Sequence, residues 1–328
     1  MNERPGNQLF DAYFTARDMR EVFCDQGRVQ AMLDFEAALA RAEARVGLIP
    51  HTAVAPIEAA CQAGHYDFAA LGEAIATAGN SAIPLVKALG KQIAANDAQA
   101  ERYVHLGATS QDVMDSGLVL QLRRALQLID SDLAQLGQTL ATQAQRYAAT
   151  PLAGRTWLQH ATPVTLGMKI AGWLGAVTRS RQRLLELKPR LLVLQFGGAS
   201  GTLAALGEQA MPIAQALAEE LRLTLPDQPW HTQRDRLVEF GSVLGLIAGS
   251  LGKLGRDISL LMQTEAAEVF EPSAPGKGGS STMPHKRNPV GAAVLIGAAT
   301  RVPGLLSTLF SAMPQEHERS LGLWHAEW

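Results

Sequence analysis

Residues 232–270 carry an unbroken apolar repeat, and this repeat restricts the possible fold more than any other feature of the sequence. Its members follow one another in steps of three and four: Leu237, Phe240, Leu244, Ile247, Leu251, Leu254, Ile258 and Leu261. This 3.5-residue period is typical of helices that supercoil around neighbouring helices. A single helix over the whole range would be roughly 58 Å long at about 1.5 Å per residue, whereas an average globular helix has about 11 residues.

Two more segments have a helical pattern. The first begins near residue 112 and repeats in the same steps, through Leu122, Leu126, Ile129, Leu133, Leu136 and Leu140. The second covers residues 163–194, where Gly172, Gly175 and Pro189 predict a bend or loose packing. Helices this long need partners along their whole length, and one chain offers few. The sequence therefore predicts an all-α fold, a long-helix bundle assembled from several chains, with these leucines in its core.

The part of the chain before residue 112 is organised differently, as short helices separated by turn signals. The stretch "RVQAMLDFEAALARAEARVGLIP" has apolar residues at helical spacing and then Gly47 and Pro50 as stop signals. No run in the sequence alternates apolar and polar residues for long enough to indicate a strand. We expect an N-terminal helical domain over residues 1–111 and a central long-helix bundle domain over residues 112–328.

The composition excludes several classes of protein. Apolar residues make up 47% and charged residues 18% of the chain, and the formal net charge is −2, so the basic excess of proteins that bind nucleic acid or anionic membranes is missing. The two cysteines, Cys24 and Cys61, form no CxxC pair, which argues against a disulfide framework and suits a reducing cytoplasm. No stretch approaches about 18 uninterrupted apolar residues. We expect a cytoplasmic protein that binds neither nucleic acid nor membrane.

Three polar stretches that contain glycine separate the helical segments: "HLGATSQD" (105–112), "GRTWLQHATP" (154–163) and "PGKGGSSTMPHKRNP" (275–289). Each could be a solvated connector, but each also sets hydroxyl groups beside His, Arg or Lys. "HERS" and "HAEW", near residue 328, lack a third clustered ligand, so we interpret them as solvated helix residues and not as a metal site. The three stretches are the candidate functional regions.

The third stretch combines glycines with cations. Its glycines permit backbone angles at which consecutive amides converge on an anion, and its cations are Lys277, Lys286 and Arg287. The order GxxxxGK[ST] of a phosphate loop is absent. The stretch therefore predicts a loop that closes over a carboxylate-bearing substrate and delivers Ser280 or Ser281 to it.

These stretches carry a resemblance to a known family. "GSSTMPHKRNP" resembles the long, specific GSSxMPxKxNP pattern of the fumarase/aspartase superfamily, and "ATSQDVMDS" and "GRTWLQHATPVTLG" resemble its other two motif regions. "FGGASGTLAALG" also fits, and the likeness runs from about Leu9 to Trp328. Through "NQLFDAYFTA", "ERYVHLGATSQD" and "LGLWHAEW", the sequence is most similar to the lactone-forming cycloisomerases of this superfamily.

The resemblance implies an assembly and a domain organisation. Members of the superfamily are homotetramers around a central helical bundle, and each active site draws one motif region from each of three subunits. The family also continues beyond "WHAEW" into a further helical domain, so that domain is expected to be missing from a sequence that stops at Trp328. A homotetramer agrees with the repeat of residues 232–270, which predicts partner chains independently.

The resemblance also implies a reaction. Family members form or cleave a C–O or C–N bond beta to a carboxylate, through an enediolate-like intermediate. By position, Ser280 is the base, and Lys286 and Asn288 hold the carboxylate on which charge accumulates. A serine hydroxyl is a poor base, so it needs amide donors and cations in a water-poor site. The other candidate contacts are His160, as a further catalytic residue, and Thr109, Ser110, Arg155, Thr156, Trp157, Gln159, His105, Ser281 and Met283, as substrate-binding residues.

Trp157 departs from the family pattern. Many relatives have a histidine here, which helps to protonate the leaving group in several lyases. A carboxylate, with a reference pKa near 4, leaves readily as an anion and needs no such proton. Trp157 therefore favours lactone chemistry over adenylosuccinate lyase or fumarase chemistry, although His160 could reach the same pocket. The implied substrate is a small tricarboxylate, and no cofactor or metal is expected.

Two alternatives stay open. One is another lyase of the superfamily, which would act on succinate-like adducts as adenylosuccinate or argininosuccinate lyases do. The other is a catalytically silent helical scaffold. The presence of Ser280, Lys286 and Asn288 in the motif argues against the scaffold.

Overall fold

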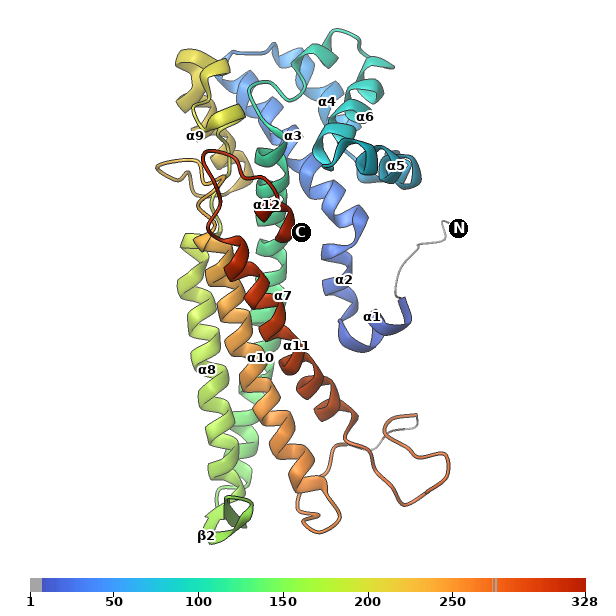
Figure 1. The fold of residues 1–328 in the computed structure, drawn as a ribbon, viewed down its shortest axis with the longest axis vertical. Coiled ribbons are helices and arrows are strands. Elements are labelled where there is room, and N and C mark those ends of the chain that lie inside the picture. Colours follow the sequence, from blue (N-terminus) through green and yellow to red (C-terminus); the bar gives the residue numbers. More distant parts are fainter. Residues whose placement is uncertain (1–7, 273, 275) are drawn as a thin grey trace. The chain divides into compact units, whose positions relative to one another are not determined.

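The structure is a computed structural model that describes residues 8–272, 274 and 276–328 (Figure 1). Asn7 and Pro275, which open two of the stretches quoted above, lie outside the described residues. In chain order the elements are α1 (Gln8–Phe14), α2 (Arg17–Phe23), α3 (Asp25–Val46), α4 (Val54–Ala60), α5 (Phe68–Ala78), α6 (Ala82–Ala94), α7 (Ser110–Arg146), β1 (Pro151–Thr156), β2 (Gln159–Thr165), α8 (Leu166–Leu191), α9 (Ala210–Leu221), α10 (Asp235–Met262), α11 (Val290–Ala312) and α12 (Leu323–Ala326).

The chain divides into two compact units. The first, called here the bundle unit, comprises Met1–Thr15, Ile129–Leu187 and Leu237–Ser311. The second, called the α3 unit, comprises Ala16–Leu128, Lys188–Arg236 and Ala312–Trp328. These units are defined by contacts within one chain, and the predicted division at residue 111 stays a prediction.

Long helices form the bundle unit, and Figure 1 shows α8, α10 and α11 running side by side. The 3.5-residue repeat predicted α10, which has 28 residues. It ends at Met262 and not near residue 270, because the chain reverses there: Ala267 has a φ of 51°, and the Glu268 N–H donates to the Leu261 carbonyl at 3.0 Å. The predicted all-α fold is confirmed.

The closest approach of α10 and α11 occurs at glycines of α10. A Cβ added to Gly252 would lie 2.4 Å from the Cβ of Ala299, so no side chain fits at this position. Gly255 approaches Leu295, and Gly241 approaches Leu309. Because the partner numbers fall as the α10 numbers rise, the two helices are antiparallel.

The apolar stripe of α10 is only partly covered. Leu237, Ile247 and Leu254 are each 7% exposed, whereas Leu244 and Leu251 are half-buried. Most of α11 is half-buried or exposed, including apolar side chains such as Leu305 and Phe310. One chain therefore leaves apolar surface on these helices for other partners to cover.

By length and composition alone, α10 and α11 could cross a membrane, which the sequence analysis did not expect. In α10, 39% of the most apolar window is buried, and in α11 none of it is. Core helices of water-soluble proteins meet the same two criteria, so the observation is weak evidence for a membrane span.

The stretch 154–163, a candidate functional region in the sequence, forms a hairpin, although no alternating apolar pattern indicated a strand there. β1 and β2 form an antiparallel hairpin that pairs Thr156 with Gln159 and Arg155 with His160. Trp157 and Leu158 make the two-residue turn, with φ of 53° and 62°. Hairpin turns of this kind normally use Asn-Gly or Gly because both φ angles are positive, so Trp-Leu gave no turn signal.

The α3 unit is organised around α3. This helix ends at Gly47, which has a φ of 85° and confirms the predicted stop signal. Its side chains Leu33 and Phe35 are fully buried, and the helix packs against α9. Residues Ser110–Leu128 of α7 belong to this unit, so the start of α7 is fixed within it.

Candidate functional site

The Ser280 loop, defined as residues 276–289, is closed by its own backbone. Gly276 and Gly278 have φ of 76° and 69°, which side-chain-bearing residues rarely adopt. The Asn288 N–H donates to the Gly278 carbonyl at 2.9 Å. A Cβ at Gly278 would lie 2.6 Å from the Asn288 carbonyl oxygen, so only glycine allows this closure.

The side chains of the Ser280 loop have few partners. Ser280 is half-buried, and its Oγ accepts a hydrogen bond from the Met283 N–H at 3.1 Å. Ser281, Met283 and Lys286 are exposed. Among the residues that the structure describes, the Lys286 ammonium takes part in no ion pair. This cation is available to an anion from outside the loop.

Arg155 on the hairpin is already paired. Its guanidinium donates two hydrogen bonds to the carboxylate of Glu268, at 2.7 and 2.9 Å. These bonds raise the pKa of Arg155 and hold the pKa of Glu268 below its ordinary value. Arg155 can bind a substrate carboxylate only in competition with Glu268.

The other predicted hairpin contacts are exposed. Thr156, Gln159 and His160 are all exposed, and Trp157 at the turn is 95% exposed. A cavity of about 780 Å³ in the bundle unit includes Arg155 and Thr156 among its lining residues, with Lys169 and Trp173 of α8, but it includes no residue of the Ser280 loop. The cavity is therefore not a complete active site.

The Thr109 segment, defined as residues 105–110, leads into α7 in the α3 unit. His105 has a φ of 62°, and its Nδ1 lies 2.6 Å from Oε1 of the buried Glu36. Burial alone would lower the pKa of His105, but the adjacent Glu36 carboxylate raises it above its ordinary value. This ion pair anchors the start of the segment.

Arg319 contacts both predicted hydroxyls of the segment. Its Nη1 donates to Thr109 Oγ1 at 2.9 Å, and its Nη2 donates to Ser110 Oγ at 3.4 Å. The guanidinium also lies over the ring of Trp324, 5.9 Å from its centroid. Burial lowers the pKa of Arg319, and the side chain forms no ion pair among the described residues. Arg319 was not among the residues predicted from the sequence.

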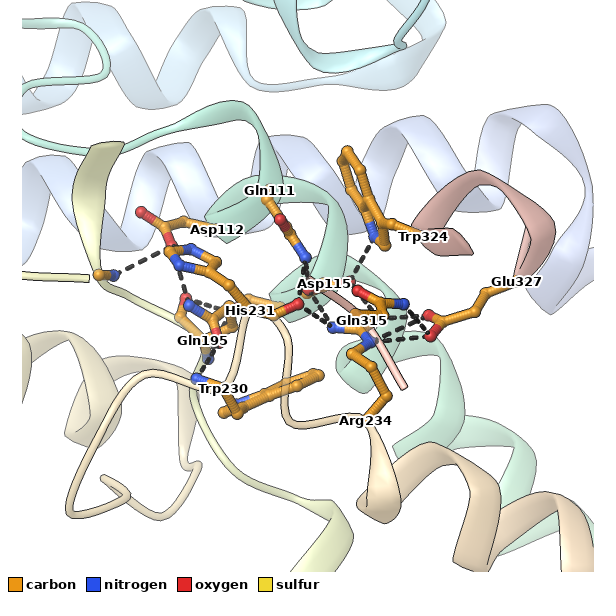
Figure 2. Close-up of polar contacts among 12 residues, drawn as sticks. Gln111, Asp112, Asp115, Gln195, Trp230, His231, Arg234, Gln315, Trp324 and Glu327 are labelled. Atoms are coloured by element: carbon orange, nitrogen blue, oxygen red, sulfur yellow. Dashed lines mark hydrogen bonds and ion pairs between the residues drawn. The ribbon is translucent and has the colours of Figure 1, made fainter. Parts of the chain in front are cut away.

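Asp112, on the first turn of α7, is fully buried. Its two carboxylate oxygens accept five hydrogen bonds of 2.8 to 3.1 Å, from the backbone N–H groups of Thr109, Gly197 and Gly198 and from the side chains of Gln195 and His231. Figure 2 shows Gln195 and His231 beside Asp112. "TSQD" is a capping pattern, in which the acidic residue accepts from the N–H of the hydroxyl residue three positions earlier. That signal could have identified Asp112 from the sequence.

A second buried cluster is centred on Asp115, three positions after Asp112 on α7 (Figure 2). Arg234 is 1% exposed and donates two hydrogen bonds to Asp115, at 2.6 and 3.0 Å. Its Nη2 also donates to Glu327 at 2.5 Å. Within "HAEW", His325 and Trp328 are exposed, as the interpretation of solvated residues expected, but the Glu327 side chain is buried against Arg234. "HERS" lies outside any helix.

The predicted site residues therefore fall into three groups. His105, Thr109 and Ser110 belong to the α3 unit, and the hairpin and the Ser280 loop belong to the bundle unit. The side-chain hydrogen bonds of the Ser280 loop residues stay within the loop. Over residues 8–272, 274 and 276–328, no group of three or more His, Cys, Asp or Glu side chains could hold a metal ion.

Comparison with known proteins identifies the family. A sequence profile of the lyase family matches residues 12–304. The chain belongs to this family. The fumarase/aspartase resemblance of the motifs is thereby confirmed, and it extends over both units.

Three relatives illustrate the similarity. The 3-carboxy-cis,cis-muconate cycloisomerase of Pseudomonas aeruginosa is 79% identical over the whole chain, which covers 72% of that protein. The crystal structure of 3-carboxy-cis,cis-muconate lactonizing enzyme from Pseudomonas putida superposes with a TM-score of 0.95 at 79% identity, over 98% of this chain and 71% of that one. Fumarate lyase from Mesorhizobium sp. matches with a TM-score of 0.86 at 41% identity, over 96% of this chain and 70% of that one.

Proposed function

We propose that this chain catalyses the intramolecular ring closure of 3-carboxy-cis,cis-muconate to a carboxymuconolactone, a step in the breakdown of protocatechuate. The observation that carries this proposal is the 79% identity to the cycloisomerase of Pseudomonas aeruginosa over all 328 residues. The presence of Trp157 where many lyases of the superfamily have histidine supports it, because lactone chemistry needs no protonated leaving group.

In the proposed reaction, a carboxylate oxygen of the substrate adds to the alkene and forms the new C–O bond. The electron pair of the alkene moves onto the neighbouring carboxylate, which becomes enediolate-like. Ser280 then donates its hydroxyl proton to the alpha carbon, and the resulting alkoxide is reprotonated from solvent. Because both reacting groups belong to one molecule, no second substrate is needed.

The substrate carries three carboxylates, and the described cations suit them. Lys286 and Asn288 would hold the carboxylate that gains charge, while Ser281 and Met283 line the same loop. Arg319, which has no carboxylate partner in the part of the chain that the structure describes, would bind a second carboxylate beside the hydroxyls of Thr109 and Ser110. These assignments use side chains that no internal ion pair occupies.

The active enzyme is proposed to be a cytoplasmic homotetramer in which each site combines the three groups of residues from different subunits. The incompletely covered stripe of α10 and the exposed face of α11 support this assembly, because apolar helix faces of this size need partners. Within the bundle unit, the cavity beside the hairpin includes no residue of the Ser280 loop, which supports a shared site.

The test is a direct assay of the diene. The purified chain is mixed with 3-carboxy-cis,cis-muconate, and loss of the conjugated-diene absorbance is followed, with argininosuccinate and adenylosuccinate in parallel reactions. We expect the diene absorbance to decay and the two succinate adducts to stay intact. Turnover of either adduct without decay of the diene would replace the proposal by a beta-elimination, and a tetramer that turns over none of the three would favour a silent scaffold.

A further inference from the structure

Two segments of the α3 unit meet at Asp112. One is the Thr109 segment, and the other is the Gly198 segment, defined as residues 196–201. They touch directly, since a Cβ on Gly198 would lie 3.0 Å from the Gly107 carbonyl oxygen. Oδ2 of Asp112 accepts from the backbone N–H of Thr109 at 3.0 Å and of Gly198 at 2.9 Å. A single oxygen atom therefore holds the two segments together.

The other oxygen of Asp112 is also fully used. Oδ1 accepts from the Gly197 N–H at 3.0 Å, from Gln195 Nε2 at 3.1 Å and from His231 Nε2 at 2.8 Å. A carboxylate offers about four lone-pair positions, so five donors saturate it. Since a carboxylate only accepts, His231 must carry its proton on Nε2.

From this arrangement we infer that Asp112 is a positioning residue for substrate binding: it fixes the Thr109 and Ser110 hydroxyls, together with Arg319, in the geometry that receives a substrate carboxylate. The inference rests on the proposed function for the identity of the substrate. Asp112 itself is fully buried, so it acts through the groups it holds and not by direct contact. Nothing in the proposed reaction requires its charge at the reacting carbon, so its influence passes through the Thr109 backbone.

The chemistry of a carboxylate at this position makes the inference testable. In Asp112→Asn, one oxygen becomes an NH₂ donor. If it replaces Oδ2, the N–H groups of Thr109 and Gly198 face another donor, and if it replaces Oδ1, three donors lose their acceptor. Buried donors without an acceptor are costly, so the Thr109 segment should move in either orientation of the amide. The hydroxyls would then no longer meet the substrate together with Arg319.

The experiment compares steady-state kinetics and amide hydrogen exchange of the assembled enzyme for the parent, Asp112→Asn and Asp115→Asn. Asp115 is the matched control, because it is a buried carboxylate on the same helix that binds Arg234 and not the two segments. For Asp112→Asn we expect KM to rise at least tenfold with kcat within threefold, because an interaction held equally in substrate and transition state is lost. Exchange in residues 103–112 and 195–201 should become faster. Asp115→Asn should lower Tm and leave KM within twofold.

Each other outcome has a defined meaning. Unchanged KM in a folded Asp112→Asn enzyme, or a fall in kcat alone, would overturn the inference and leave the proposed function standing. If the parent does not turn over 3-carboxy-cis,cis-muconate, the proposed function fails. The effect of Asp112→Asn on amide hydrogen exchange in the two segments then decides by itself whether Asp112 holds them together. If Asp112→Asn does not fold, Gln195→Met replaces it, since this change keeps the carboxylate and removes one of its donors, together with the acceptor of the Trp230 N–H. It should raise KM at least threefold, and an unchanged KM would overturn the inference.

Discussion

The Ser280 loop and the surroundings of Asp112 hold their polar groups in opposite ways. In the Ser280 loop, the hydroxyl of Ser280 has one hydrogen bond, from the Met283 N–H, and Lys286 extends from an exposed position. Around Asp112, one buried carboxylate accepts five hydrogen bonds from three parts of the chain. The first region is held almost only by its own backbone, and the second by buried side chains.

This difference indicates a division of labour. Polar networks that are buried and satisfied make a region rigid, because moving any member leaves a donor or acceptor without a partner. A loop with few internal partners can change its shape at little cost, and it needs a ligand or a neighbouring chain to order it. We therefore expect substitutions around Asp112 to act on binding, substitutions around Arg234 to act on stability, and substitutions in the Ser280 loop to act on turnover.

The largest effect is expected for Arg234→Met. Removing the guanidinium leaves the carboxylates of Asp115 and Glu327 in the protein interior without their cation. Breaking a buried pair in this way costs about 3–5 kcal/mol of unfolding free energy. Urea denaturation followed by circular dichroism measures it. Arg17→Met, which removes an exposed pair with Glu21, should cost less than about 1 kcal/mol, and equal losses in the two variants would break the comparison.

Next is Ser280→Ala, which should lower turnover at least about 100-fold, because positioned proton transfer contributes roughly 10²–10⁴. Its Tm and its size in light scattering should match those of the parent, since the hydroxyl has one partner on a partly exposed loop. Ser131→Ala, at an exposed position of α7, is the control and should keep full activity. Residual turnover above about 1% of the parent would remove Ser280 from the proton-transfer role.

A smaller, pH-dependent effect is expected at Glu43. This carboxyl is fully buried, and neither oxygen has a hydrogen-bond partner among the described residues. Burial, with the charge of Glu36 adding to it, raises its pKa to about 9. Between its ordinary pKa of 4.5 and about 9, the unfolded chain releases this proton and the folded chain keeps it. The contribution of Glu43 to stability therefore falls as the pH rises through this window.

Glu43→Gln removes that dependence, because an amide does not ionise. The unfolding free energy of the variant, measured relative to the parent, should rise by more than about 1 kcal/mol from pH 5.5 to pH 8. The exposed Glu73 of α5 provides the control, and Glu73→Gln should show no such trend. A difference between Glu43→Gln and the parent that is constant with pH would show that Glu43 is ionised in the folded protein.

The smallest effect is expected for Trp157→His. If the carboxylate leaving group needs no proton, an imidazole at the hairpin turn should change the rate of lactone formation by less than about threefold, well below the 10²–10⁴ of a working general acid. Leu158→His, at the adjacent and also exposed turn position, is the control for a new imidazole nearby. Acceleration of more than tenfold in Trp157→His alone would contradict the proposed chemistry.

Part of this organisation could be predicted from the sequence. The three-four repeat predicted α10, the similar repeat predicted α7, and Gly47 predicted the end of α3, because period and stop signals are local properties of the chain. The β1–β2 hairpin was missed because its turn residues, Trp157 and Leu158, are not those that favour positive φ.

The partners of the polar groups could not be predicted in the same way. Arg319 was passed over because "HERS" was interpreted as a solvated helical segment, and its contact with Thr109 joins residues 210 positions apart. Glu327 was misjudged for the same reason, since its partner Arg234 lies 93 positions earlier. Only the "TSQD" capping pattern pointed to Asp112, and it identifies just one of the five donors.

The sequence by itself determined the helical class and the lengths of the main helices to within a few turns, and its motif predicted the Ser280 loop as a candidate site. Helix formation and motif spacing depend on residues close together in the chain, so they can be recognised without coordinates. The tertiary structure alone decided that Asp112 binds Gln195 and His231, 83 and 119 positions away. Such contacts depend on how whole elements pack, because a buried carboxylate takes its donors from whichever segments the packing brings to it.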